Sequence, residues 1–163
     1  MARSTSAAIL ACALGAPALA QSRQHLPEPL DLRISASVAA KEGRVLLVLF
    51  SETGCMFCEH LRREVLLPMQ RNADLRKKIE FFQVDVDAPK SLRDFAGIES
   101  TQKELARRYR IRIMPTVLLL GPQGEILAEP LVGFNGSDFY GAYLDERIET
   151  ARGKLSTRRA VPK

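Results

Sequence analysis

The sequence predicts an α/β fold in which helices cover both faces of a central mixed β-sheet. A continuous apolar run of strand length occupies residues 45–50, as is typical of a strand buried on both faces. Residues 79–84 and 116–120 form two further runs of strand length that are mainly apolar. Segments of helical character separate these three runs. Because such strands need apolar cover on each side, we expect an α/β protein with three layers: helix, sheet and helix.

The first half of the predicted fold contains a helix, a strand and a second helix. We expect a short helix over residues 35–42, ahead of the strand at 45–50. A turn then leads to the second helix, which begins at Cys55. Pro68 should kink this helix or begin a break near Leu67, because proline lacks a backbone N–H and clashes with the preceding turn.

A longer connection over residues 88–100 follows the second strand, and we expect a helical turn within it at residues 92–95. Thr101 can cap the third helix, which should run to about Tyr109. Glu104 stands three residues after Thr101, where its side chain completes a capping box.

A β-hairpin and a final helix close the predicted fold. Residues 121–124, Gly-Pro-Gln-Gly, form a tight turn, so residues 125–131 should be the antiparallel partner of the third strand. Asn135 or Ser137 caps the final helix, which should end near Ala151.

The N-terminal segment has the three parts of a secretory signal peptide. Arg3 precedes an apolar run over residues 7–14, and a small-residue Ala-Leu-Ala sequence ends at Ala20. This order predicts export and cleavage after Ala20, and therefore a periplasmic protein. The alternative is lipidation at Cys12, but bulky Leu10 stands where a lipoprotein cleavage box usually has a small residue.

We therefore divide the 163 residues into a signal peptide at 1–20, an N-terminal arm at 21–33, one domain at 34–151 and a basic C-terminal tail at 152–163. The chain has 24 Lys and Arg against 19 Asp and Glu, a formal net charge of +5. So small an excess does not by itself indicate a nucleic-acid partner, which would need a clustered basic face. We expect a monomer that binds no nucleic acid.

The mature chain would keep one pair of cysteines, Cys55 and Cys58, because the third lies within the predicted signal peptide. Their spacing at the start of a helix places the two Cα atoms about 5.5 Å apart, within the range of a disulfide. At the helix N-terminus, free N–H groups and the helix dipole favour a thiolate on Cys55. We therefore expect Cys55 to be the exposed nucleophile and Cys58 the buried resolving thiol.

A static disulfide and half of a zinc site are the alternatives for this pair. A disulfide that closes so short a loop stabilises little, since the entropic gain grows with loop length. A zinc site needs further Cys, His or carboxylate ligands, and the sequence has no second cysteine pair. We expect redox exchange, with no cofactor and no bound metal.

Residues 50–58, Phe-Ser-Glu-Thr-Gly-Cys-Met-Phe-Cys, and residues 113–116, Ile-Met-Pro-Thr, resemble the thioredoxin superfamily. The resemblance covers most of residues 34–151 and is greatest to secreted bacterial thioredoxin-like proteins, including the SoxW type. It implies a thioredoxin fold and thiol–disulfide exchange with partner proteins.

The resemblance also implies a substrate-binding surface. In the family, the proline matching Pro115 is cis and faces the cysteine pair, and the backbone matching Met114 pairs with an extended substrate segment. A cis X-Pro bond turns backbone groups toward the pair for β-type pairing with a partner. Met56 and Phe57, between the two cysteines, complete the predicted substrate-binding residues.

Two features depart from the family's pattern. Leu49 stands where thioredoxin has a buried acidic residue that moves protons at the resolving thiol, so the proton route must differ. Gly54 replaces the tryptophan before the pair, and Met56 and Phe57 replace the Gly-Pro between the cysteines. These changes argue against general cytosolic thioredoxin activity and leave the exchange chemistry intact.

We expect a periplasmic thiol–disulfide oxidoreductase that reduces partner disulfides through Cys55 and Cys58. Its partners would be protein thiols and disulfides, with a membrane or periplasmic redox partner that recharges the pair. The same steps run in reverse in a disulfide-forming oxidant, which is one alternative. The other is a non-catalytic copper-delivery module on the same fold, for which the domain offers His60 as a further ligand.

Overall fold

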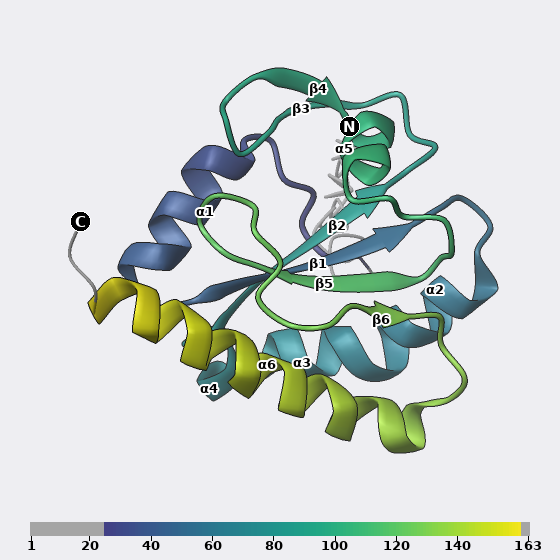
Figure 1. Cartoon of the computed structure of the whole chain (residues 1–163). Coiled ribbons are helices and arrows are strands. Elements are labelled where there is room, and N and C mark those ends of the chain that lie inside the picture. Colours follow the sequence, from purple (N-terminus) through teal and green to yellow (C-terminus); the bar gives the residue numbers. More distant parts are fainter. Residues whose placement is uncertain (1–24, 161–163) are drawn as a thin grey trace, which may run out of the picture.

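The computed structural model of the chain describes residues 25–160, so the predicted signal peptide at 1–20 lies outside the described residues. Its middle layer is a mixed four-stranded sheet with the strand order β2-β1-β5-β6 (Figure 1). The central strand β1 is parallel to β2 and antiparallel to β5, which pairs in turn with β6. The strands are β1 (Val45–Ser51), β2 (Ile79–Asp85), β5 (Thr116–Leu120) and β6 (Leu131–Val132). The predicted α/β class and mixed sheet are confirmed.

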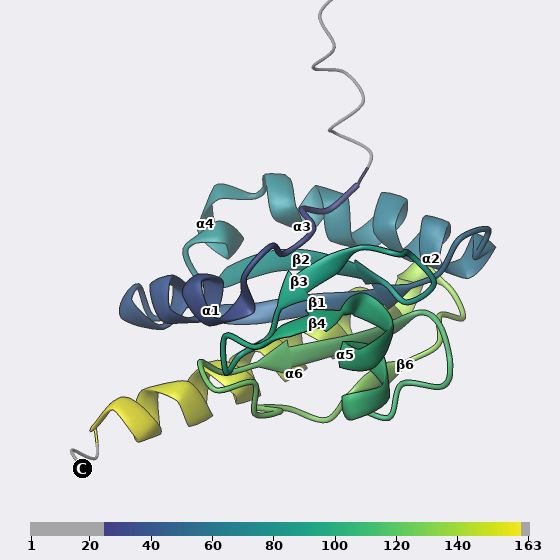
Figure 2. The same ribbon diagram turned by 90° about the horizontal axis from the view of Figure 1, so that it is seen from above.

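Helices cover both faces of this sheet, which explains why β1 is buried along its whole length. Leu47 and Leu49 point into a core formed with α2, α3 and α6, whereas Leu46 and Val48 point into a second core formed with α1 and α5. Seen from above, α1, α5 and the hairpin of β3 (Ser91–Arg93) and β4 (Glu99–Thr101) lie over the sheet (Figure 2). The helices are α1 (Leu32–Lys41), α2 (Met56–Leu61), α3 (Leu67–Arg71), α4 (Ala73–Arg76), α5 (Gln102–Arg108) and α6 (Ser137–Ala160).

Helix α1 begins at Leu32, three residues before the predicted start. The Asp31 carboxylate caps it by accepting the Ile34 N–H at 2.9 Å, and Leu32 is buried in the core. The chain ahead of the helix also packs on the fold, because the Pro27 carbonyl accepts the Gln83 N–H of β2 at 2.9 Å.

The helix that begins after Cys55 does not break near Leu67. A π-helical segment, η2 (Arg62–Leu66), joins α2 to α3, and within it the Leu67 N–H donates to the Arg62 carbonyl five residues back. Pro68 then lies in the first turn of α3, where its missing N–H is tolerated. The helix therefore continues to Arg71, and Asn72 caps the short α4.

The helical turn predicted at residues 92–95 is wrong, because this segment belongs to a small antiparallel hairpin. Its strands are β3 (Ser91–Arg93) and β4 (Glu99–Thr101). The buried Asp94 carboxylate accepts the N–H groups of Ala96 and Ile98, each at 2.9 Å. An aspartate that bonds the backbone ahead of it in this way favours a tight turn over a helix.

The predicted start of the third helix is confirmed. The Thr101 hydroxyl accepts the Glu104 N–H at 3.2 Å, and the Glu104 carboxylate accepts the Thr101 N–H at 2.8 Å. This is a complete capping box, and α5 ends before Tyr109.

The predicted partner of β5 forms two short contacts instead of one strand over residues 125–131. Ile126 bridges to Leu120, and β6 pairs further along with the start of β5. Between these contacts Leu127 and Ala128 are buried in the core, and Pro130 has no N–H for a ladder bond. The chain therefore leaves the sheet edge and returns to it.

Helix α6 extends to Ala160, well past the predicted end near Ala151. Leu155 lies on its inner face and is buried against the same core as Ile148 and Ala151. This burial offsets the low helix propensity of Gly153, so most of the segment predicted as a basic tail is helical.

Candidate active site

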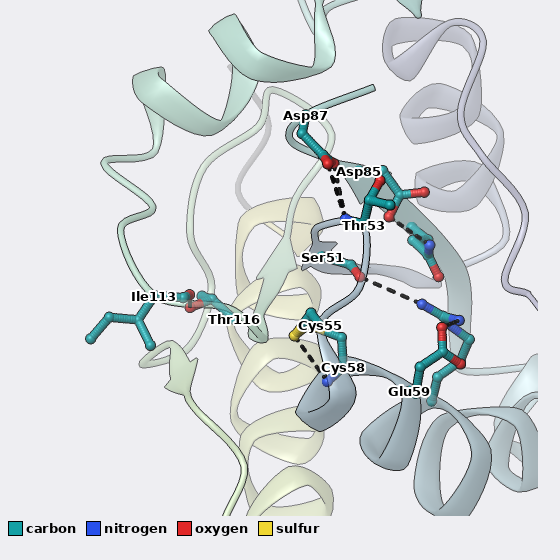
Figure 3. Close-up of a disulfide and its surroundings, with 11 residues drawn as sticks. Ser51, Thr53, Cys55, Cys58, Glu59, Asp85, Asp87, Ile113 and Thr116 are labelled. Carbon is teal, nitrogen blue, oxygen red and sulfur yellow. Dashed lines mark hydrogen bonds and ion pairs between the residues drawn. A yellow bond between two sulfur atoms is a disulfide. The ribbon is translucent and has the colours of Figure 1, made fainter. Parts of the chain in front are cut away.

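The cysteine pair lies where β1 ends and α2 begins. Ser51 is the last residue of β1, and a short turn over residues 52–54 leads to Cys55 at the N-cap of α2 (Figure 3). Gly54 has a φ of 74°, in the left-handed region that favours glycine. A Cβ at this position would meet nothing within 4 Å. Glycine is therefore needed here for its backbone conformation and not for lack of space, and it also leaves the approach to Cys55 open.

The two sulfur atoms form a disulfide, and their Cα atoms are 5.2 Å apart, as the helical spacing predicts. The Cys58 N–H donates to Cys55 Sγ at 3.2 Å. Cys55 is partly exposed, whereas Cys58 is completely buried. Only the first cysteine of the pair is thus reached by solvent.

The predicted substrate-binding residues lie in two places next to the pair. Met56 and Phe57 project from the start of α2, with 65% and 57% of their surfaces exposed. On the other side, Thr116 of β5 pairs with Phe50 of β1, so the Ile113–Thr116 segment reaches the same end of the sheet as Cys55. Figure 3 shows Ile113 and Thr116 across from the disulfide.

The Met114–Pro115 peptide bond in this segment is cis. Pro115 is buried and its carbonyl accepts the Gly133 N–H at 2.7 Å, while Met114 is half-buried. The Thr116 hydroxyl donates to the Ile113 carbonyl at 2.7 Å, which fixes the turn. The segment is therefore held on both sides of Met114.

An acidic residue beside the site was not predicted. The Thr53 N–H donates to both carboxylate oxygens of Asp87, each at 3.1 Å. Hydrogen bonds from the Thr53 side chain and backbone hold the pKa of Asp87 below its ordinary value. Asp87 follows β2, which is parallel to β1, and the carboxyl ends of parallel strands meet at one edge. The position of Asp87 just after a strand parallel to β1 is the sequence feature that could have predicted it.

One charged side chain near the pair is buried, where the sequence favours an exposed charge. The Arg62 side chain is only 3% exposed, and it donates to the Glu59 carboxylate at 2.8 Å. Its second terminal nitrogen lies 3.5 Å from the Ser51 hydroxyl. Leu49, which stands where thioredoxin has its buried acid, is packed in the apolar core. Among the buried charged residues, the one nearest to Cys58 in the sequence is thus a cation, Arg62.

A hollow of about 380 Å³ adjoins Phe57 and the loop at residues 134–138, and His60 and Glu64 contribute to its walls. Among residues 25–160, no three Cys, His, Asp or Glu side chains come together in a way that could hold a metal ion. No helix in that range combines the length and the apolar character needed to cross a membrane.

Comparison with known families identifies this architecture. The family described as the thioredoxin-like domain matches residues 32–147. The chain belongs to the thioredoxin-like family. A thioredoxin-like domain that carries the Cys55–Cys58 disulfide is a thiol–disulfide oxidoreductase.

Solved thioredoxins share the fold of this thioredoxin-like protein. The thioredoxin of Thermus thermophilus is 22% identical with a TM-score of 0.54, over 81% of this chain and 90% of that chain. The thioredoxin NaTrxh of Nicotiana alata is 20% identical with a TM-score of 0.52, over 78% of this chain and 95% of that chain. The thioredoxin of Fasciola hepatica is 20% identical with a TM-score of 0.51, over 76% of this chain and 97% of that chain. Identities this low show the fold alone. No curated protein matches this sequence.

Proposed function

We propose that this thioredoxin-like protein reduces the disulfides of partner proteins in the periplasm. The observation that carries the proposal is the unequal access to the two sulfurs, since Cys55 is partly exposed and Cys58 is buried. An exchange enzyme needs one thiol that meets the partner and one that waits behind it. A structural disulfide has no need of this difference.

The proposed reaction passes two electrons to the partner. The Cys55 thiolate attacks one sulfur of the partner disulfide, which breaks, so that a mixed disulfide forms and one partner thiolate leaves and takes up a proton. Cys58, deprotonated, then attacks Cys55 Sγ. The mixed disulfide breaks, the second partner thiolate leaves, and the Cys55–Cys58 disulfide remains. A dithiol of a membrane or periplasmic redox protein restores the reduced pair.

We place the partner segment between the exposed Met56 and Phe57 on one side and Met114 on the other. An extended segment there would meet the backbone of Met114 and Pro115 in a β-type pairing. The exposed apolar side chains at the rim, with Ile113 56% exposed, suit a partner that presents apolar residues around its disulfide.

The periplasmic location rests on the signal-peptide features of residues 1–20. Together with the resemblance of residues 50–58 and 113–116, they favour the secreted bacterial thioredoxin-like group that includes the SoxW type. Intact-mass analysis of protein from the periplasm should find a chain that begins at Gln21. Retention of residues 1–20, or a lipid on Cys12, would contradict this part of the proposal.

The experiment that tests the reaction is insulin reduction combined with the reduction potential of the pair. A reductant should reduce insulin catalytically and have a potential near that of thioredoxin, about −270 mV, whereas an oxidant would lie near about −120 mV. Failure to reduce insulin, together with tight stoichiometric copper binding by the reduced protein, would favour copper delivery instead.

A further inference from the structure

Arg62 is a buried cation one helical turn beyond Cys58. Its side chain is 3% exposed, and a charge removed from water is costly unless other groups neutralise it. Nothing in the exchange reaction described above uses this residue. Its burial so close to the reacting sulfurs therefore needs an explanation.

The partners of Arg62 neutralise it only in part. Its ion pair is with Glu59, whose side chain is 59% exposed and is therefore shared with solvent, which weakens the pairing. The contact with the Ser51 hydroxyl is long, at 3.5 Å. Within the described chain, the buried Nε atom of Arg62 has no hydrogen-bond partner. Part of the positive charge of the Arg62 guanidinium is therefore not neutralised on the buried side of the helix.

Arg62 lies on the same face of the helix as the resolving thiol, and both residues are buried. The Arg62 N–H donates to the Cys58 carbonyl, so the two residues are one regular helical turn apart, and their Cβ atoms are then about 5–6 Å from each other. Ser51 is the last residue of β1, just before the turn that leads to Cys55 (Figure 3). Because its hydroxyl oxygen accepts from Arg62, its own proton remains available for a further acceptor.

Cys58 is the group that benefits from a nearby cation. A completely buried thiol resists ionisation, because burial disfavours the charged form, yet only the thiolate can attack the mixed disulfide. With Leu49 in the apolar core, the position that holds an acid in thioredoxin is apolar here. A buried guanidinium carries the opposite charge to such an acid, and it offsets the cost of ionising the buried thiol by stabilising the thiolate directly.

We propose that Arg62 is a positioning residue for the exchange reaction, which stabilises the Cys58 thiolate through its own charge and through the Ser51 hydroxyl. The inference rests on the thiol–disulfide exchange proposed above. Cys58 releases its proton to solvent, and its thiolate attacks Cys55 Sγ while the bond from Cys55 to the partner sulfur breaks. Because the same charge stabilises the reduced protein, Arg62 also raises the reduction potential of the pair.

The test is the equilibrium of the pair with glutathione, together with the pKa values of the thiols in the reduced protein. Arg62→Met keeps most of the side-chain volume and removes the charge. We expect the variant to be more reducing by about tenfold in the equilibrium constant, which corresponds to about 30 mV for two electrons, and the pKa of Cys58 to rise. Arg62→Lys keeps the charge and should restore most of both values.

Arg63→Met is the matched control, since it removes the same charge one residue further on from a side chain that is 68% exposed. It should leave the potential and the pKa values unchanged. If Arg62→Met folds and its equilibrium constant stays within twofold of the wild type, Arg62 is structural only and the inference is wrong. An equal shift of the equilibrium constant in Arg63→Met would show that the effect comes from net charge in general, which would also contradict the inference.

Should Arg62→Met fail to fold, Ser51→Ala decides the question. Removing the hydroxyl should shift the glutathione equilibrium toward the disulfide, in the same direction and by less, and an unchanged equilibrium would overturn the inference. Neither measurement needs a partner protein. Failure of the wild type to reduce insulin would therefore count against the proposed function alone, and an unchanged potential in the variants against Arg62 alone.

Discussion

The backbone N–H of Cys58 points at the Sγ atom of Cys55 and donates a hydrogen bond to it at 3.2 Å. The bond joins the N-cap of α2 to the first turn of the helix. When the disulfide is reduced, this donor faces a sulfur that can carry negative charge, and hydrogen bonds to the charged form lower a pKa. We therefore expect this N–H to favour the thiolate form of Cys55 in the reduced protein.

The two cysteines should consequently behave differently when each is replaced. Cys58→Ser leaves the exposed thiol that attacks and removes the one that resolves, so mixed disulfides with partner proteins should accumulate through Cys55. Cys55→Ser should abolish both turnover and trapping, because a buried Cys58 does not reach a partner's sulfur. Non-reducing gels of the variants expressed in a native periplasm measure the difference. Trapping by Cys55→Ser alone would reverse the two roles.

Glu59→Gln should shift the potential in the direction opposite to Arg62→Met. The substitution removes the carboxylate 2.8 Å from the guanidinium, so more positive charge remains to stabilise the thiolate. We expect the glutathione equilibrium to move toward the reduced form by about threefold, equivalent to a pKa change of about half a unit. Glu64→Gln, in the exposed pair with Arg63, is the control. A shift that persists when Arg62 is also replaced would mean that Glu59 acts on the thiol without Arg62.

Because of Asp94, the free energy of unfolding should decrease as the pH is lowered into the acid range. Its hydrogen bond with Arg108 and those from Ile98 and Ala96 lower its pKa from the ordinary 3.8. A depressed folded pKa contributes stability that is fully present above about pH 4 to 5 and is lost as the pH falls through the lower folded value.

Asp94→Ala should therefore destabilise the protein at pH 7 by about 1–3 kcal/mol, since two backbone donors lose their acceptor, and the difference from wild type should shrink toward pH 3. Urea unfolding at several pH values measures it. Asp74→Ala, at a side chain that is 82% exposed, should have a small effect at every pH. An Asp94→Ala penalty that does not change with pH would contradict the assignment.

The C-terminal part of α6 should contribute to global stability. Leu155 is buried against the core cluster that includes Ile148, and Leu155→Ala should lower the free energy of unfolding by about 2–3 kcal/mol. Lys154→Ala, at the exposed neighbouring position, should change it by less than about 0.5 kcal/mol. Equal effects of the two substitutions would show that the end of the helix does not pack as described.

Local patterns were enough to predict the framework of this protein. The apolar runs around Val48 and Leu118 specify buried strands, and the Thr101–Glu104 pair specifies a helix start through groups only three residues apart. The spacing of Cys55 and Cys58 fixes their Cα separation, because a helix has one geometry. Each of these features depends on residues that are neighbours in the chain.

Tertiary packing decided what surrounds that framework. Arg62 is an ordinary charged residue in the sequence, and it becomes a buried cation only because the helix packs on the end of β1 and brings it to Ser51. Asp94 lies in a turn and not in a helix because strands form on either side of it. Helix α6 continues past Gly153 because Leu155 is buried against the core. A residue's charge, cap or apolar face can be recognised in the sequence, but its energetic effect depends on partners that only the folded chain brings within reach.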